Sequence, residues 1–232
     1  MKKGTSWLVP ILIAIFMIAG CGKKSGLEGK IVDYKGQPLS GLNVIAHQVQ
    51  PIEGYAEFET ATGQDGKFLF KDFYPSSDYV ISVRHKDWRS DAVAQVTAGP
   101  GGKTIKLKEP IRILFAVSGD GVITDFTSGL EWMGGPDEDT NWDAAQAWCL
   151  NLSVAGGGWR MPTRTELNTL YNNGFGKRNL TSIFKKTVWG VWSGEHLNNE
   201  KACDFDFTTG LEAWRLRTTA DYERAFAVRS PK

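Results

Sequence analysis

The stretch Trp159-Arg160-Met161-Pro162-Thr163-Arg164-Thr165-Glu166-Leu167 decides the fold of the region around it. Pro162 disfavours helical conformation in the residue before it, so a helix has to begin after Pro162. Thr163 is then a good N-cap, and Glu166 three residues later completes a capping box. The pattern predicts an anchor in which Trp159 packs inside and Pro162 fixes the direction in which the helix leaves.

Four further blocks flank this stretch in order along the chain. They are Asp120–Trp132, Asn141–Leu152, Val191–Ser193 and Ala225–Arg229. The series resembles the Lcl C-terminal domain (DUF1566), a bacterial family, over about residues 113–230. The resemblance implies a variant of the C-type lectin fold. It also implies binding without catalysis, directed in the best-studied relative at sulfated polysaccharide.

Length and composition exclude several classes. A chain of 232 residues predicts one or two domains. The net charge of +1 gives no electrostatic case for a nucleic-acid partner. Abundant glycine, with 26 residues, and 12% aromatics favour a turn-rich β or α+β protein over a helical bundle.

The first 20 residues are expected to be a lipoprotein signal peptide. Lys2 and Lys3 precede an apolar run, 7–19, that is shorter than the roughly 20 residues of a membrane span. The run leads into Ile18-Ala19-Gly20-Cys21, which resembles a bacterial lipobox with Cys21 as the lipidated residue. We expect residues 21–26 to be a tether and several acyl chains to hold the protein at the membrane. Gly22 instead of Asp indicates, by resemblance to sorted lipoproteins, the outer membrane of the cell envelope.

Residues 27–108 alternate as several short strands with turn signals such as Asp65-Gly66 between them, which predicts a small β-sandwich. The blocks Gly29–Val32, Gly36–Leu39 and Thr62–Phe68 resemble the carboxypeptidase regulatory-like (transthyretin-like) domain. Such domains are usually spacers or interaction modules. Nothing in this region pairs a nucleophile with a base.

Residues 113–230 predict two helices and a meandering antiparallel sheet, so the whole chain is expected to be mainly β and α+β. The first helix follows Thr140, which forms a capping signal with Asp143. One face of that helix is apolar and includes Trp142 and Cys149. The strands are expected at 112–118, 122–126, 130–133, 188–192, 202–207, 212–217 and 224–228.

Seven tryptophans lie between Trp132 and Trp214. Trp132, Trp142 and Trp159 are expected in the core, as structural anchors with Pro162, Thr163 and Glu166. Trp192 and Trp214 are the candidates for a platform on which a sugar ring stacks.

Basic residues gather at two places. Lys177, Arg178, Lys185 and Lys186 lie in one loop-like segment, and Arg215 and Arg217 alternate in a strand, so they share a face. Such clusters bind sulfate or carboxylate groups, with Arg offering a bidentate fork. From Phe115 onward 12 Lys and Arg stand against 15 Asp and Glu, so any anion site has to be local. The glycan-binding candidates are Lys185, Lys186, Trp192, Trp214, Arg215 and Arg217.

The acidic residues and the cysteines of the chain do not form a recognisable metal-binding motif. Asp137 to Asn141 begins like an EF-hand, but Trp142 stands where that loop needs Gly, and Trp148 where it needs Glu. We therefore expect a solvated acidic loop, no metal and no cofactor. Relatives commonly pair the helix cysteine with one in the closing strand, where this chain has Ala227. That leaves Cys203 as the partner for Cys149, and the sequence leaves open whether the two are bonded or are buried thiols.

Three functions remain. The first is a lipid-anchored envelope protein whose lectin-like domain binds an extracytoplasmic glycan or polymer, such as an acidic or sulfated polysaccharide, and acts in adhesion. The second is an envelope assembly module that binds a protein through the same domain. The third, an enzyme, is disfavoured because no nucleophile has an evident base and orienting partner.

Overall fold

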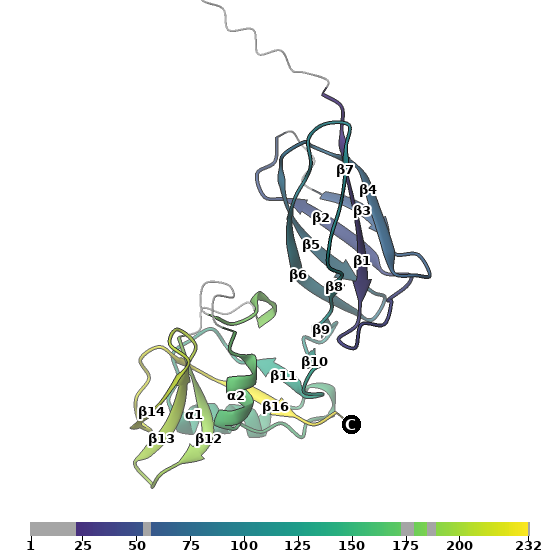
Figure 1. Cartoon of the computed structure of the whole chain (residues 1–232). Coiled ribbons are helices and arrows are strands. Elements are labelled where there is room, and N and C mark those ends of the chain that lie inside the picture. Colours follow the sequence, from purple (N-terminus) through teal and green to yellow (C-terminus); the bar gives the residue numbers. More distant parts are fainter. Residues whose placement is uncertain (1–21, 53–56, 173–178, 185–188, 232) are drawn as a thin grey trace, which may run out of the picture.

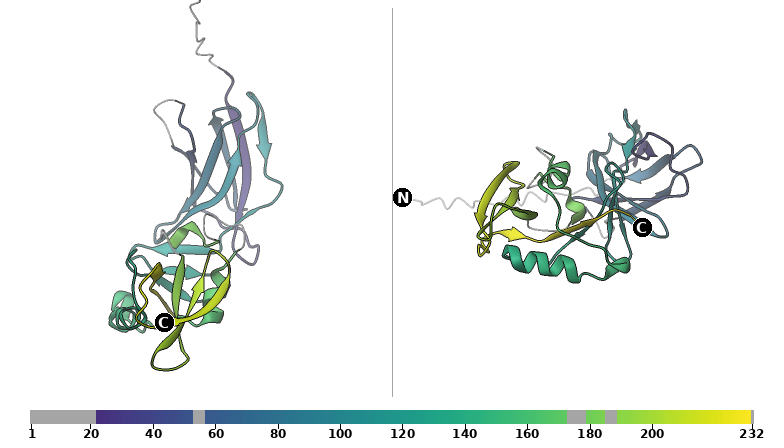
Figure 2. Two further views of the ribbon diagram at one scale, coloured as in Figure 1. Left: turned by 90° about the vertical axis from the view of Figure 1, so that its left-hand side faces the viewer. Right: turned by 90° about the horizontal axis from the view of Figure 1, so that it is seen from below.

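The computed structural model describes residues 22–52, 57–172, 179–184 and 189–231. In these ranges the protein is mainly β with two α-helices, as the sequence predicts. We call residues 22–113 the first half and residues 114–231 the second half; Figures 1 and 2 show them as two bodies joined at the strands in teal. Among the described residues, no helix has the length and apolarity needed to cross a membrane.

The first half is a sandwich of two sheets. One sheet has the order β4-β1-β7, with β8 also pairing β1, and the other begins β3-β2-β5-β6. The strands are β1 (Ser25–Val32), β2 (Asn43–Gln48), β3 (Glu57–Ala61), β4 (Lys67–Phe73), β5 (Asp78–Arg84), β6 (Trp88–Thr97), β7 (Thr104–Lys106) and β8 (Ile111–Arg112).

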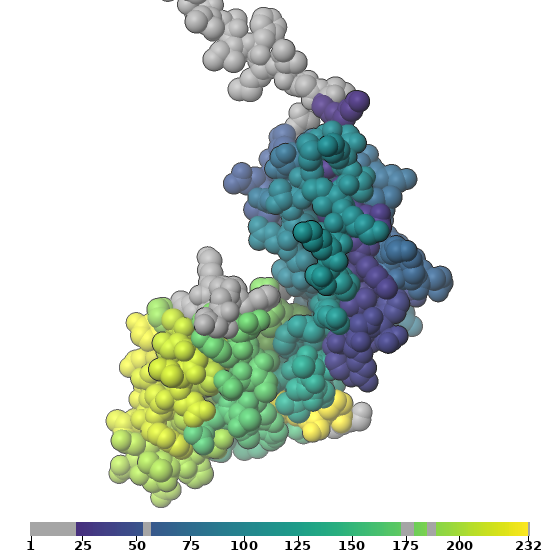
Figure 3. Space-filling model, in the orientation of Figure 1, coloured from purple at the N-terminus to yellow at the C-terminus, as the bar shows by residue number. Residues whose placement is uncertain are grey.

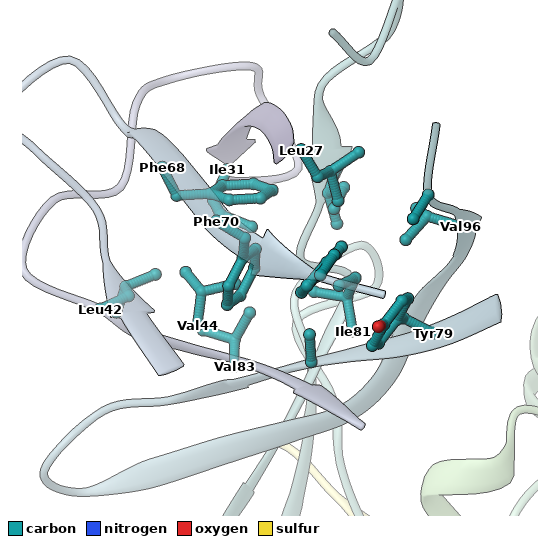
Figure 4. Packing of buried hydrophobic residues seen from close by; sticks show 14 of the residues in the cluster. Leu27, Ile31, Leu42, Val44, Phe68, Phe70, Tyr79, Ile81, Val83 and Val96 are labelled. Carbon is teal, nitrogen blue, oxygen red and sulfur yellow. The ribbon is translucent and has the colours of Figure 1, made fainter. Parts of the chain in front are cut away.

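The core of the sandwich lies between these sheets. Alternate residues of β1, β2, β4 and β5 point inward (Figure 4). Phe73 and Tyr79 stack at the centre with ring centroids 3.9 Å apart. Ile111 and Ile113 also pack in this core, so the segment expected as one strand over 112–118 is divided.

The second half holds both helices and the remaining strands. They are β9 (Phe115–Ser118), β10 (Ile123–Asp125), β11 (Glu131–Gly134), α1 (Trp142–Asn151), α2 (Arg164–Leu170), β12 (Gly190–His196), β13 (Lys201–Asp206), β14 (Leu211–Leu216), β15 (Glu223–Arg224) and β16 (Phe226–Arg229). Two short 3-10 turns, η1 (Val154–Gly156) and η2 (Ser182–Phe184), complete it. Figure 2 shows α1 along one side of this half.

One eight-stranded sheet runs through both halves, in the order β16-β11-β10-β9-β6-β5-β2-β3. The link is β9, which pairs with β10 on one side and with Trp88 and Arg89 of β6 on the other. A separate sheet of order β14-β13-β12-β15, here called the C-terminal sheet, packs beside it. It is an antiparallel meander over β12, β13 and β14, whereas β15 joins β12 in parallel. The closing segment expected as one strand therefore divides at Ala225 between two sheets.

The stretch that begins the second helix ties these sheets together. Thr163 and Glu166 form the capping box of α2, with Thr163 Oγ1 accepting from the Glu166 N–H and Glu166 Oε2 accepting from the Thr163 N–H. The backbone of Arg160 bridges to Val228 of β16, and the Pro162 carbonyl accepts from Gly194 of β12 at 2.8 Å.

The three tryptophans expected as anchors are buried. Trp132, Trp142 and Trp159 are 0%, 2% and 4% exposed. Gly156, Gly157 and Gly158 before Trp159 all have positive φ, a conformation that only glycine adopts without strain in three successive residues. The cap of α1 is one residue later than expected, because Asn141 Oδ1 accepts from the Ala144 N–H whereas the Thr140 hydroxyl donates to the Asn141 carbonyl.

Candidate functional site

The C-terminal sheet places the predicted binding residues on two opposite faces. Arg215 lies opposite Ala202 of β13, and Trp214 lies opposite Cys203. Because neighbouring residues of a strand point to opposite sides, Trp214 and Arg215 face away from each other. Arg215 and Arg217 do share a face, which is the one toward α1. The four predicted residues that the structure describes, Trp192, Trp214, Arg215 and Arg217, therefore do not form one site. Lys185 and Lys186, like Lys177 and Arg178, lie outside the described residues.

The prediction that Trp192 offers a stacking platform is wrong. Its side chain is fully buried between the C-terminal sheet and α1, and its Nε1–H donates to the Thr140 carbonyl at 2.8 Å. Residues 190–193 of β12 are all buried, and a large aromatic side chain there contributes much of the buried area of a small core.

Arg217 is part of the fold and is not a free donor. Its guanidinium lies 4.2 Å from the Trp142 ring centroid and forms an ion pair with Asp143. A further hydrogen bond joins Nη1 to the Asn199 carbonyl at 3.4 Å. These contacts fasten β14 to the start of α1.

Arg215 is held differently, with one edge bonded and the other directed outward. Its Nε lies 2.9 Å from Asp204 Oδ2 and 3.4 Å from Glu223 Oε1. The two carboxylate side chains are 2% and 3% exposed, whereas that of Arg215 is 45% exposed. Within the described residues neither Nη group has a hydrogen-bond partner in the protein. The arrangement presents a guanidinium of fixed orientation to the solvent.

Burial makes this cluster electrostatically unusual. Desolvation raises the pKa of both the Asp204 and the Glu223 carboxyl above the usual range. One oxygen of each, Asp204 Oδ1 and Glu223 Oε2, is buried without a hydrogen bond. Gly190 packs against the pair, because a Cβ there would lie 3.2 Å from Asp204 Oδ2. The carboxylates thus serve to orient Arg215 and are closed to the solvent themselves.

Two exposed aromatic residues adjoin the cluster in sequence. Trp189 precedes Gly190 and Tyr222 precedes Glu223, and the first residues of β12 and β15 are paired. The Trp189 and Tyr222 rings lie 5.7 Å apart and are 45% and 61% exposed. Tyr222 has φ of 76°, a left-handed conformation that is strained for a bulky side chain. Strain kept at an exposed aromatic residue is typical of a functional position.

The family model of the Lcl C-terminal domain matches residues 121–229. The matched range includes α1, α2, the C-terminal sheet and the whole Arg215 cluster, and it begins after β9. It covers the region whose blocks resemble this family in the sequence.

Two solved structures are similar to parts of the chain. One is a candidate carbohydrate-binding protein from Pseudomonas aeruginosa, with 15% identity, TM-score 0.26, and coverage of 40% of this chain and 90% of that one. The other is the dioxygenase domain of a dioxygenase carbohydrate-binding protein fusion from a cellulolytic Streptomyces, with 17% identity, TM-score 0.22, and coverage of 40% and 85%. No curated protein matches the chain.

The opposite face of the Lcl C-terminal region carries Trp214. It is 41% exposed, and the Arg164 guanidinium lies 5.5 Å from its ring centroid. Arg164 is in turn paired with Glu212 at 2.7 Å. Trp214 is accessible, and the Arg164 guanidinium beside it is bonded to Glu212.

The tentative disulfide between Cys149 and Cys203 does not form; both residues are buried free thiols. Cys149 of α1 packs in one core cluster with Ala202 of β13, whereas Cys203, the next residue of β13, points to the other side of the sheet. Burial raises the pKa of Cys149 to about 12 and that of Cys203 to about 11.

The acidic loop before α1 is bound to an arginine and is not simply solvated. Arg224, whose side chain is 10% exposed, pairs with Asp137 and Asp139. In the described part of the chain no group of His, Cys, Asp and Glu has the arrangement of a metal site.

Sequence reasoning found Arg215 but missed what orients it. Asp204 and Glu223 lie 11 and 8 residues away along the chain, and only strand register brings them together. The one sequence signal is their position inside apolar strands, where a carboxylate needs a partner.

Proposed function

We propose that the protein is a lipid-anchored protein of the cell envelope whose Lcl C-terminal region binds an acidic polysaccharide at the Arg215 surface, which consists of Trp189, Arg215 and Tyr222. The observation that carries this proposal is the Arg215 guanidinium, whose outer donors are directed to solvent by two buried carboxylates. A guanidinium of fixed orientation matches the paired oxygens of a carboxylate or sulfate group.

The aromatic pair supplies the second element of sugar binding. The C–H groups of a pyranose ring pack on the faces of aromatic side chains, and Trp189 and Tyr222 are large, exposed and in mutual contact. Arg215 thus offers a charge contact, and the aromatic pair, whose members precede Gly190 and Glu223 in the sequence, offers a stacking contact. The surface resembles a binding site and offers no nucleophile, since both thiols are buried and held protonated.

Retention on a heparin column at low salt tests the proposal. Arg215→Gln should elute earlier because it loses a charge-assisted contact, with affinity falling about tenfold, or about 1.4 kcal/mol. Tyr222→Gly should also elute earlier without loss of stability, since glycine relieves the positive φ. Arg84→Gln removes one exposed positive charge from β5 of the first half and is the matched control.

Equal retention of Arg215→Gln, Tyr222→Gly and the wild type, with circular dichroism showing folded proteins, would overturn the glycan proposal. It would favour the alternative of a protein-binding assembly module. The exposed edge strand β14, with Leu211, Trp214 and Leu216 all more than one-third exposed, is the feature that supports this alternative.

Anchoring through Cys21, at the outer membrane, is part of the proposal and concerns residues outside those described. The lipobox-like sequence before Cys21 supports it. Cys21→Ser should abolish labelling by a fatty acid and release the protein from the membrane fraction. A mutant that labels and fractionates like the wild type would contradict the anchor.

A further inference from the structure

A cavity lies where the two halves meet. This partly open cavity of ≈ 560 Å³ is lined by residues of β6 and β8 of the first half and of β9, β10, α2 and η2 of the second. Its volume falls within the range of about 300–1,000 Å³ that is usual for small-molecule sites. Figure 3 shows the two halves as separate lobes that meet in this region. The cavity shares no residue with the Arg215 surface.

The lining of the cavity is mainly apolar. Leu114, Phe115 and Ile183 contribute side chains from the connecting segment, β9 and η2. Leu114 is 42% exposed although it is a large aliphatic residue, so it offers apolar surface that the protein itself does not cover. Polar residues of the lining include Thr127, Ser128, Thr169 and Thr181. An apolar wall with a few polar groups is the usual composition of a site for a small organic ligand.

The wall from β6 is shaped by a local departure from strand geometry. The pairing of β5 with β6 shifts register between Ile81 and Val83, and Ala92 there has φ of 52°. The Ala92 N–H donates to Ser82 Oγ at 3.0 Å, which holds the bulge in place. A left-handed alanine costs free energy, so its presence at the cavity wall indicates that the shape of the wall matters.

The charged residues of the lining differ in whether they have bonding partners. Asp91 is paired with Arg89 at 3.3 Å, and the buried Asp125 carboxylate accepts from the backbone of Thr127 and Ser128 and from the Ser128 hydroxyl. Arg112 differs, because within the described chain it has no ion pair. Its guanidinium makes a single long hydrogen bond, 3.5 Å, to the Tyr34 carbonyl. The lining thus combines apolar surface with a hydrogen-bonded carboxylate, Asp125, and with one cation, Arg112, that has no ion pair among the described residues.

We propose that this cavity binds a small amphiphilic anion, with an apolar body against Leu114, Phe115 and Ile183 and a single carboxylate or sulfonate on Arg112. The apolar body gains about 25 cal/mol for each Å² removed from water. The anionic group gains a charge-assisted hydrogen bond at the rim. Both halves contribute contacts, so the first half is part of a binding site and is more than a spacer. The proposal does not rest on glycan binding at the Arg215 surface.

Fluorescence of 1-anilinonaphthalene-8-sulfonate, which has an aromatic body and one sulfonate, tests the proposal on the chain from Gly22 to Lys232. We expect saturable binding of one probe per chain and displacement by decanoate. Arg112→Gln should weaken probe binding about tenfold, whereas the charge-matched control Arg84→Gln should leave it unchanged. Leu114→Asp should weaken it as well, since it adds a negative charge to the apolar wall.

The proposal would be overturned if the probe showed no saturable binding, or if Arg112→Gln and Arg84→Gln weakened binding equally. It would also be overturned if either Arg112→Gln or Leu114→Asp alone left probe binding unchanged. Thermal unfolding of each variant checks that it is folded; Arg112 and Leu114 are both exposed, so little loss of stability is expected. Heparin retention of Arg112→Gln should equal that of Arg84→Gln. This separates failure of the cavity proposal from failure of the Arg215 surface.

Discussion

At the scale of single residues, Asp204 and Glu223 should give the protein a distinctive pH dependence. Burial raises the pKa of both carboxyls, so the folded chain binds their protons more tightly than the unfolded chain does. Their contribution to stability is therefore fully present below the unfolded values of about 4. It is lost as the pH rises through the higher folded values.

The variant Asp204→Asn tests this dependence, because it removes one titrating group and keeps an oxygen for Arg215. The free energy of unfolding in urea should fall less between pH 5 and pH 8 in the variant than in the wild type. The difference is about 1.4 kcal/mol for each unit by which the pKa is raised. Asp221→Asn, which removes an exposed carboxyl near β15, should keep the wild-type slope. Parallel curves for Asp204→Asn and wild type would show that Asp204 does not titrate as described.

At the scale of elements, the capping box of α2 fastens more than a short helix. Glu166 accepts from the Thr163 N–H and also pairs with Arg160 through two hydrogen bonds of 2.8 and 2.6 Å. The Arg160 backbone is bridged to Val228, so the cap connects α2 to β16.

Replacing the cap measures its contribution. Thr163→Ala should lower the free energy of unfolding by about 1 kcal/mol, because the Glu166 N–H loses its acceptor. Thr163→Ser keeps the hydroxyl and should remain close to the wild type. Urea unfolding followed by tryptophan fluorescence gives both values. If the two variants are equally stable, the side-chain hydroxyl is not what holds this end of the helix.

At the scale of the whole molecule, the sequence predicts what depends on neighbours along the chain. The capping box at Thr163, the burial of Trp159 and the alternating strands of the sandwich all follow from local spacing. The contacts of Arg217 do not follow from local spacing, because its partners Trp142 and Asp143 belong to α1, which is distant from Arg217 in the sequence. The division of the closing segment is not predicted from local spacing either: β15 before Ala225 and β16 after it belong to different sheets. Register across strands decides these features, and one sequence does not reveal it.

The continuity of the large sheet predicts where the second half can be separated from the first. The Lcl C-terminal match begins at residue 121, but β9 precedes it, pairs with three residues of β10 and packs Val117 in one core cluster with Ile123 and Trp132. A chain of residues 121–232 lacks this strand, so Ile123 loses a packing partner and β10 gains an open edge. A chain of residues 113–232 keeps β9 but loses the pairing of β9 with β6 and the packing of Ile113 in the core of the sandwich.

The reactivity of the buried thiols measures whether each shortened chain is folded. Cys149 and Cys203 are both 0% exposed, so a folded chain should protect them from a thiol reagent such as dithiobisnitrobenzoate. We expect protection in residues 22–232 and in residues 113–232, and rapid reaction of both thiols in residues 121–232, with an earlier urea midpoint. Equal protection in the two shorter chains would show that β9 belongs to the first half alone. In that case the eight-stranded sheet would be a contact between two independent units.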